Sequence, residues 1–284
     1  MKFYKMHGLG NDFVFVLAGV SDLPSLKLMA KAVCDRNFGV GADGLIVLVP
    51  SDKADLRMVI YNSDGTEAEM CGNAIRCAAV LWAQKDPDAK EPISVETLKG
   101  IQYCTIKDRS NRDWKVTVDM GEPVLKPDLI PVKGQGEAII GAPYDACGME
   151  FRFTCVNMGN PHAVAFVEET TRKLMLEAGP EMEVHPGFPR KTNVEFAQML
   201  PDGGIKVFVW ERGVGPTLAC GSGACAVAVA AHLSARAGRS SRIDLPGGSL
   251  DIEWTDDNRV LMTGPAAFVF KGELKDRYEE GQEV

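Results

Sequence analysis

The chain has 284 residues, of which 45% are hydrophobic and 25% charged, a composition that is typical of a soluble globular protein and excludes a wholly disordered chain. This length suits two domains of ordinary size. The formal net charge of −8 argues against a nucleic-acid partner, because nucleic-acid-binding proteins gather lysine and arginine on one face.

The N-terminal residues 1–7 contain no apolar run long enough for a secretory signal. No stretch of about 18 uncharged apolar residues, which would predict a membrane span, occurs in the sequence. We therefore expect a cytoplasmic protein with no membrane partner. In that compartment the eight cysteines stay reduced, so a disulfide framework is not expected.

The first half of the chain alternates between predicted strands and helices. A helix is predicted over 26–34, because Pro24-Ser25 before it and the turn around Phe38-Gly39 after it are typical helix boundaries. A second helix is predicted over 72–84. Alternating apolar residues between turn signals predict strands at 12–16, 45–49, 56–61, 93–96, 101–107 and 114–119.

The second half repeats this plan, with a helix predicted from about 221 to 237. Strands are predicted at 163–167, 194–199, 205–211, 243–245, 250–254 and 260–263. The closing run 266–270 is one strand more than the second half requires, so we expect it to return to the first domain. The helices over 72–84 and 221–237 are apolar nearly all round, which is typical of buried helices.

A pattern of Gly-Asn followed by Cys-Gly occurs twice, first at Gly10-Asn11 with Cys71-Gly72 and again at Gly159-Asn160 with Cys220-Gly221. Both pairs are displaced by 149 residues (160 − 11 and 220 − 71). The strand predicted over 56–61 also aligns with residues 205–210 at this displacement. We therefore interpret the chain as an internal duplication.

Strands and helices alternate in each half, so the duplicated units are expected to share one architecture. We expect two pseudosymmetric domains, each a mixed or antiparallel sheet wrapped round a central buried helix. The first domain is predicted over residues 1–120, with the C-terminal strand 266–284 returning to it, and the second over 121–265.

Cys71 and Cys220 each precede a predicted helix. Unpaired backbone N–H groups and the positive end of the helix dipole favour a thiolate there, and lower the pKa of a cysteine from roughly 8.5. If the halves pack about a pseudo-twofold axis, the two thiols would face each other across one cleft, which suggests proton transfer on two sides of a carbon. The other six cysteines are interpreted as small buried residues: Cys34, Cys77, Cys104, Cys147, Cys155 and Cys225.

A structural zinc site is the other interpretation of these cysteines. Cys71 and Cys77 are six residues apart, and Cys220 and Cys225 are five apart. Neither spacing is the short gap of a zinc knuckle, and on a helix the members of each pair would point to different faces. We expect no metal.

Seven motifs occur in order along the chain, at 5–13, 39–44, 62–65, 70–77, 158–162, 210–213 and 219–225. Together they resemble diaminopimelate epimerase. The resemblance implies a cofactor-independent isomerase, without pyridoxal phosphate, that interconverts LL- and meso-2,6-diaminopimelate in lysine and peptidoglycan precursor synthesis. It implies two pseudosymmetric α+β domains of the diaminopimelate epimerase-like fold with the site between them. It also implies a homodimer in which Phe270 takes the place of a usual tyrosine.

The resemblance also implies roles for individual residues. Cys220 would accept the α-proton and Cys71 would donate one in the LL to meso direction, with the roles exchanged in reverse, and His162 and Glu211 would complete the catalytic set. From the residues themselves, Arg212 offers a planar fork for a carboxylate, and Glu211 a counter-charge for an ammonium group. The expected substrate-binding residues are Asn11, Asn62, Gly72, Asn73, Asn160, Asn193, Glu211, Arg212, Gly221 and Ser222.

One departure from the family pattern concerns substrate contact, because Gly44 stands where the family commonly has a glutamine. Two alternative functions remain at this point. A proline racemase or hydroxyproline epimerase shares the fold and the two-thiol mechanism. A thiol-based redox sensor would instead form a reversible disulfide between Cys71 and Cys220.

Overall fold

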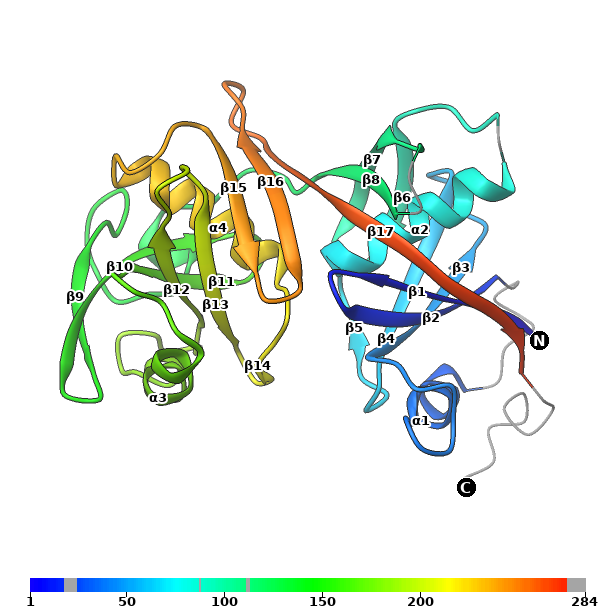
Figure 1. Cartoon of the computed structure of the whole chain (residues 1–284), viewed down its shortest axis with the longest axis horizontal. Helices are drawn as coiled ribbons and strands as arrows, with labels where there is room; N and C mark the ends of the chain where they lie inside the picture. Colours follow the sequence, from blue (N-terminus) through cyan, green and yellow to red (C-terminus); the bar gives the residue numbers. More distant parts are fainter. Residues whose placement is uncertain (18–24, 87, 111–112, 275–284) are drawn as a thin grey trace. The chain divides into compact units, whose positions relative to one another are not determined.

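The structure is a computed structural model that describes residues 1–17, 25–86, 88–110 and 113–274 (Figure 1). The chain divides into two compact units. Unit 1 consists of residues 1–118 together with the chain from Gly264 onward, and unit 2 of residues 119–263. Each unit is described separately below.

Unit 1 is built on one mixed sheet. Its strands β2 and β3 pair in parallel, as do β4 and β6, whereas β1–β2, β3–β4, β6–β7 and β7–β8 are antiparallel. The elements of unit 1 are β1 (Lys2–Gly8), β2 (Asn11–Leu17), α1 (Leu26–Cys34), β3 (Gly44–Val49), β4 (Leu56–Asn62), β5 (Glu67–Ala68), α2 (Gly72–Lys85), β6 (Ile93–Thr97), β7 (Gly100–Asp108) and β8 (Asp113–Asp119).

The last strand of the chain completes this sheet. β17 (Val260–Glu273) is one continuous strand, although the sequence predicted two segments, at 260–263 and 266–270. Its C-terminal part runs antiparallel to β1, with Phe270 opposite Lys5 and Glu273 opposite Lys2. In Figure 1 this red part of β17 lies beside the blue β1. Residues 275–284 of the predicted returning strand lie outside the described residues.

Unit 2 has the same order of strand pairings. β11 and β12 are parallel, as are β13 and β15, whereas β10–β11, β12–β13 and β15–β16 are antiparallel. The elements of unit 2 are the 3-10 helix Pro127–Leu129, β9 (Ala142–Ala146), β10 (Met149–Asn157), β11 (Pro161–Phe166), α3 (Arg172–Glu183), β12 (Asn193–Met199), β13 (Ile205–Glu211), β14 (Gly215–Pro216), α4 (Gly221–Leu233), β15 (Ser240–Leu245) and β16 (Gly248–Trp254).

One face of each sheet covers a helix that begins after a cysteine. α2 packs against β1, β2, β6 and β7, and α4 packs against β10, β11, β12, β15 and β16. Both helices are buried over nearly their whole length. Small alanine side chains let a helix of this kind lie close to a sheet on several sides, so the local sequence and the packing agree.

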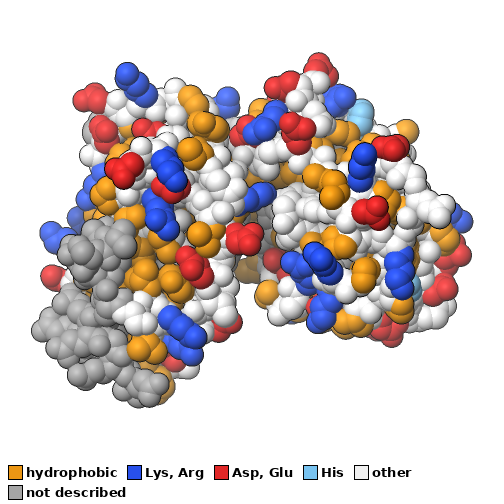
Figure 2. Space-filling view, turned by 180° about the vertical axis from the view of Figure 1, so that it is seen from behind, with side chains coloured by type: hydrophobic (Ala, Val, Ile, Leu, Met, Phe, Trp, Pro, Cys, Tyr) orange, Lys and Arg blue, Asp and Glu red, His pale blue; other side chains and the backbone are white. Residues whose placement is uncertain are grey.

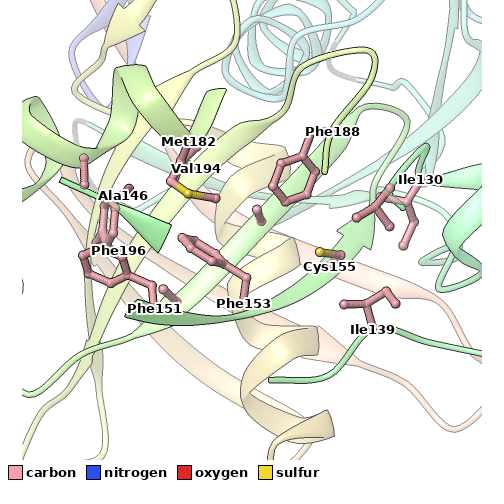
Figure 3. Packing of buried hydrophobic residues seen from close by; sticks show 14 of the residues in the cluster. Ile130, Ile139, Ala146, Phe151, Phe153, Cys155, Met182, Phe188, Val194 and Phe196 are labelled. Atoms are coloured by element: carbon pink, nitrogen blue, oxygen red, sulfur yellow. The ribbon is translucent and has the colours of Figure 1, made fainter. Parts of the chain in front are cut away.

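The opposite face of each sheet packs on a second helix. In unit 2, residues of β10, β11 and β12 form an apolar core with α3 (Figure 3). Three phenylalanines, Phe151, Phe153 and Phe196, make edge and tilted ring contacts in this core. In unit 1 the corresponding core packs on α1 through Met29 and Val33.

The predicted helix over 221–237 was too long, because α4 ends at Leu233. Ala235 takes a left-handed conformation with φ 54°, and Arg236 N donates to Ala231 O, which closes the helix with a tight turn. The strands β1, β9 and β10 and the helix α3 were not predicted. α3 contains Gly179-Pro180, residues that normally argue against a helix.

Among the described residues, no helix is long and apolar enough to cross a membrane. On the face shown in Figure 2, acidic and basic side chains are interspersed over each unit. This distribution lacks the single-sign character of a nucleic-acid-binding face.

Candidate active site

Cys71 occupies the N-cap position of α2, where its backbone is extended (φ −140°, ψ 118°). Its Sγ donates to Oδ1 of Asn11 at 3.7 Å, and Nδ2 of Asn73 donates to the same oxygen at 3.2 Å. Asn11 reaches this place because Leu9 and Gly10, both with positive φ, form the tight turn between β1 and β2. The first turn of α2 and the start of β2 therefore meet at the thiol.

Asn11 is held by a network of charged residues. Its Nδ2 donates to Asp43 at 2.7 Å, and Asp43 accepts from Arg36 at 2.7 Å. Arg36 also contacts Asp12 at 2.8 Å, and the Lys5 ammonium lies 2.6 Å from that carboxylate. Burial opposes the ionisation of Asp12, but the hydrogen bonds from Arg36 and Lys5 outweigh it and lower the pKa of the carboxyl to about 2.

Arg76 is a fully buried arginine one helical turn beyond Cys71. Its Nη1 donates to Gly72 O at 2.8 Å, its Nη2 to Asn73 Oδ1 at 2.8 Å, and its Nε to Pro265 O at 3.1 Å. Because Oδ1 of Asn73 accepts from Arg76, the amide nitrogen of Asn73 is directed to Asn11. Arg76 therefore orients the amide pair beside the thiol.

Cys220 occupies the equivalent N-cap position of α4 and is only 6% exposed. Its Sγ accepts from Gly223 N at 3.4 Å and lies 3.5 Å from Oγ of Ser222. Burial, and then the charges of Glu211 and Glu195, raise the pKa of this thiol well above its usual value, although the two hydrogen bonds oppose the rise. The prediction that the helix start favours a thiolate was therefore wrong for Cys220, because burial outweighs the dipole.

Glu211 lies at the end of β13, and its carboxylate interacts with the Cys220 thiol. It accepts a hydrogen bond from Oγ1 of Thr217 at 2.6 Å and another from the Cys220 thiol. Burial raises the pKa of the Glu211 carboxyl, and both hydrogen bonds oppose the rise. A buried carboxylate with a raised pKa is a stronger base than an exposed one.

His162 on β11 is fully buried between two polar partners. Its Nδ1 lies 2.7 Å from Oε1 of Glu195, and its Nε2 lies 2.8 Å from Oδ1 of Asn160. Glu195 on β12 is also fully buried and was not predicted from the sequence. The available signal was a glutamate directly between the apolar residues Val194 and Phe196.

Asn193 and Arg212 were both predicted to bind substrate. The amide of Asn193 is buried and serves the backbone, because its Nδ2 donates to Pro161 O at 2.7 Å and its Oδ1 accepts from Arg212 N at 2.9 Å. The Arg212 side chain is exposed and donates to Arg190 O at 3.3 Å. Asn193 thus fixes the position of the Arg212 backbone directly after the end of β13.

Asn62 ends β4, and its side chain donates to Oγ1 of Thr66 at 3.0 Å across a turn. Gly44 lies opposite Asn62 in the β3–β4 pair. A Cβ atom on Gly44 would lie 2.9 Å from Tyr61 O, so a glutamine at this position would require a shift of the backbone.

The structure therefore brings some predicted residues together within each unit. In unit 1 these are Cys71, Asn11 and Asn73. In unit 2 they are Cys220 with Ser222 and Glu211, and His162 with Asn160. Gly72 and Gly221 are the first residues of α2 and α4.

The remaining cysteines are mostly buried, as predicted, except that Cys147 is exposed. Cys147 adopts a left-handed conformation with φ 51° in the turn between β9 and β10, which keeps its side chain out of the core. Burial raises the pKa of Cys77, Cys104 and Cys155 to about 12. Among the described residues, no group of three or more His, Cys, Asp or Glu side chains is arranged to hold a metal ion.

The family model described as "Diaminopimelate epimerase" matches residues 3–126 and 154–269 of this sequence. The chain belongs to the diaminopimelate epimerase family. This membership confirms the family resemblance that the seven motifs indicated.

Individual diaminopimelate epimerases align over almost the whole chain. The chain is 52% identical over 277 residues to a diaminopimelate epimerase of Desulfitobacterium hafniense, covering 96% of this chain and 98% of that protein. It is 51% identical over 280 residues to one of Carboxydothermus hydrogenoformans, covering 96% and 99%.

A solved structure extends the comparison beyond diaminopimelate epimerases. A hydroxyproline epimerase from Agrobacterium vitis, with bound trans-4-hydroxy-L-proline, superposes with a TM-score of 0.68 over 96% of this chain and 90% of that chain, at 18% identity. At this identity the likeness shows the fold alone. The diaminopimelate epimerase family therefore shares its mixed α+β fold with an enzyme of different substrate.

Proposed function

We propose that this chain converts LL-2,6-diaminopimelate to meso-2,6-diaminopimelate with Cys71 and Cys220 as the two acid/base groups and without pyridoxal phosphate. The observation that carries the proposal is that each unit places a cysteine at the N-cap of a buried helix, in a chain of this family. The two units would then be the epimerase halves of an internal duplication.

The helix starts supply what the chemistry needs most. Removal of an α-proton leaves negative charge that spreads onto the substrate carboxylate, and no cofactor is proposed to absorb it. The first N–H groups of a helix have no intrahelical acceptor, and they bind anions. The amides that follow Cys71 and Cys220, at Gly72-Asn73 and Gly221-Ser222, would therefore donate to that carboxylate.

The protons balance as follows in the LL to meso direction. Glu211 accepts the proton of the Cys220 thiol to which it is hydrogen bonded, and the thiolate then takes the α-proton of the substrate. The Cys71 thiol gives its proton to the opposite face of the α-carbon and becomes a thiolate. After product release Glu211 loses its proton to solvent and Cys71 takes one up, which restores the starting state. In the reverse direction Cys71 removes the proton and Cys220 returns one.

The remaining predicted residues are proposed to bind the zwitterionic ends of the substrate. Asn11, Asn73 and Asn160 offer amide donors next to groups already held in place. Arg212 would pair with a carboxylate through its exposed guanidinium. Asn62 and Asn193 are included by family resemblance, Asn193 through its control of the Arg212 backbone.

We infer a cytoplasmic enzyme, as the family's biosynthetic role requires. We also infer a homodimer in which Phe270, exposed on β17 beside Phe3, contributes to the contact.

The test is proton NMR of LL-diaminopimelate in D₂O with the reduced protein and no added cofactor, followed by chiral separation of the product. Deuterium at one α-carbon together with the meso isomer is the expected result. Exchange with proline or hydroxyproline instead would identify a racemase of the same fold. No exchange with any of these substrates would contradict the proposal.

A further inference from the structure

Glu195 lies on the side of the unit 2 sheet that faces α4. Its neighbours Val194 and Phe196 belong to the apolar core on the other side (Figure 3), and side chains alternate along a strand, so Glu195 points the opposite way. A Cβ atom on Gly223 would lie only 2.7 Å from Oε1 of Glu195. The Glu195 carboxylate therefore lies against the helical turn that begins at Cys220.

Within the described part of the chain, the carboxylate of Glu195 has one hydrogen-bond partner, His162. Oε1 lies 2.7 Å from Nδ1 of His162, whereas Oε2 is buried without a partner. A carboxylate oxygen and an amide oxygen can only accept, so Nδ1 of His162 donates to Glu195 and Nε2 donates to Oδ1 of Asn160. Both side chains are 0% exposed, so His162 is the group that compensates the buried carboxylate.

Unit 1 has apolar side chains at the two equivalent positions. The displacement of 149 residues aligns His162 with Phe13 and Glu195 with Ile46. β2 and β3 pair in parallel as β11 and β12 do, and Phe13 and Ile46 are both buried. Apolar side chains in place of a buried ion pair are often neutral or stabilising, so this fold does not require the pair.

We infer that Glu195 is a positioning residue for the epimerisation, and this inference rests on the proposed function. The carboxylate accepts from Nδ1–H and fixes the orientation of the His162 ring, and Nε2–H then donates to Oδ1 of Asn160 at 2.8 Å. With its oxygen held in this way, Asn160 presents its amide nitrogen as the donor to the substrate carboxylate. The chain of contacts from Glu195 to Asn160 thus prepares the site beside Cys220.

The kinetic test is a double-mutant cycle on the full chain. Glu195→Leu is expected to lower kcat/KM about 100-fold, and Glu195→Gln, which keeps an acceptor oxygen, about 10-fold. The variant Glu195→Leu/His162→Gln should be no slower than His162→Gln alone, because Glu195 acts through His162. Losses that multiply in the double variant would overturn the inference.

A second double variant separates positioning from stability. Glu195→Ile combined with His162→Phe rebuilds the apolar pair of unit 1. It should unfold at or above the wild-type temperature by circular dichroism, yet lose epimerisation about as fully as Glu195→Leu. A lowered unfolding temperature would show that the fold needs the His162–Glu195 pair. Retained activity would show that catalysis does not need the pair. Either result overturns the inference.

A measurement on the protein without substrate distinguishes failure of this inference from failure of the proposed function. The sequence has four histidines, so the His162 ring protons can be assigned in ¹⁵N-edited NMR by their loss in His162→Gln. A slowly exchanging Nδ1 proton is expected in wild type, in Glu195→Gln and in the control Gln198→Ala on the same strand, but not in Glu195→Leu. An unchanged proton in Glu195→Leu refutes positioning, whereas an inactive wild type refutes the proposed function.

Discussion

The Sγ atom of Cys220 accepts a hydrogen bond from the amide of Gly223 at 3.4 Å, in the first turn of the helix that Cys220 caps. Cys71 has the same N-cap position on α2, but its Sγ donates to Oδ1 of Asn11. Cys220 is more buried and has carboxylates for neighbours, whereas Cys71 has amides. The thiols at equivalent positions of the two units therefore have different surroundings.

Cys71→Ala and Cys220→Ala are each expected to lower epimerisation at least about 100-fold, because each removes one of the two acid/base groups. Chiral separation of the product from LL-diaminopimelate measures the loss. Cys147→Ala is the matched control, since that cysteine is exposed, and it should retain wild-type activity. Full activity in either of the first two variants would rule out the two-base scheme.

Thr217→Val is expected to move the acid limb of the pH–rate profile to higher pH. The Thr217 hydroxyl donates to Glu211 and lowers the pKa of its carboxyl, so its loss lets burial raise that pKa further. Because Glu211 must be ionised to accept the thiol proton, activity is lost as the pH falls through its pKa. The profile of kcat/KM in the LL to meso direction checks this, and Glu211→Gln should lack the limb. A shift to lower pH would contradict the assignment of Glu211.

Gly44→Ala is expected to destabilise the protein by about 1–3 kcal/mol, because the new Cβ would lie 2.9 Å from Tyr61 O. Gly44→Gln, which introduces the residue expected there from the family resemblance, should be no more stable than Gly44→Ala and should not improve KM. Gly238→Ala is the control, since a Cβ there meets nothing within 4 Å. Urea unfolding measures the difference, and equal midpoints for the two alanine variants would contradict the prediction.

Asp12→Asn is expected to lower the free energy of unfolding by about 2 kcal/mol at neutral pH. The folded-state pKa of Asp12 is about 2, below the ordinary 3.8, so its ionised form stabilises the fold. This contribution is complete above the unfolded pKa and is lost as the pH falls through about 2. Urea midpoints of wild type and variant should therefore differ from pH 7 down to about 4 and converge near pH 2. The exposed Asp52→Asn is the control, and a difference that persists at pH 2 would refute this account.

Local signals were sufficient for much of the secondary structure. The bounds of α1 and β13 were predicted correctly, because Ser25 precedes one and a regular apolar alternation marks the other. β10 was missed, although it carries the buried Phe153 and Cys155 and lies between Gly148 and Gly159-Asn160, which are typical turn residues. The end of α4 was also missed, because the left-handed Ala235 is not a residue whose type announces a helix end.

The sequence by itself determined the family, and it singled out Cys71 and Cys220 as the candidate acid/base residues. It could do so because the motifs around both cysteines are continuous in the chain and repeat at a constant displacement. Only the tertiary structure decided the state of the Cys220 thiol, whose pKa depends on burial and on two carboxylates from β12 and β13. It alone also paired His162 with Glu195, which the parallel register of β11 and β12 brings together across 33 residues of sequence. Charges and hydrogen bonds act over distances in space, and a linear pattern does not contain those distances until the sheet has formed.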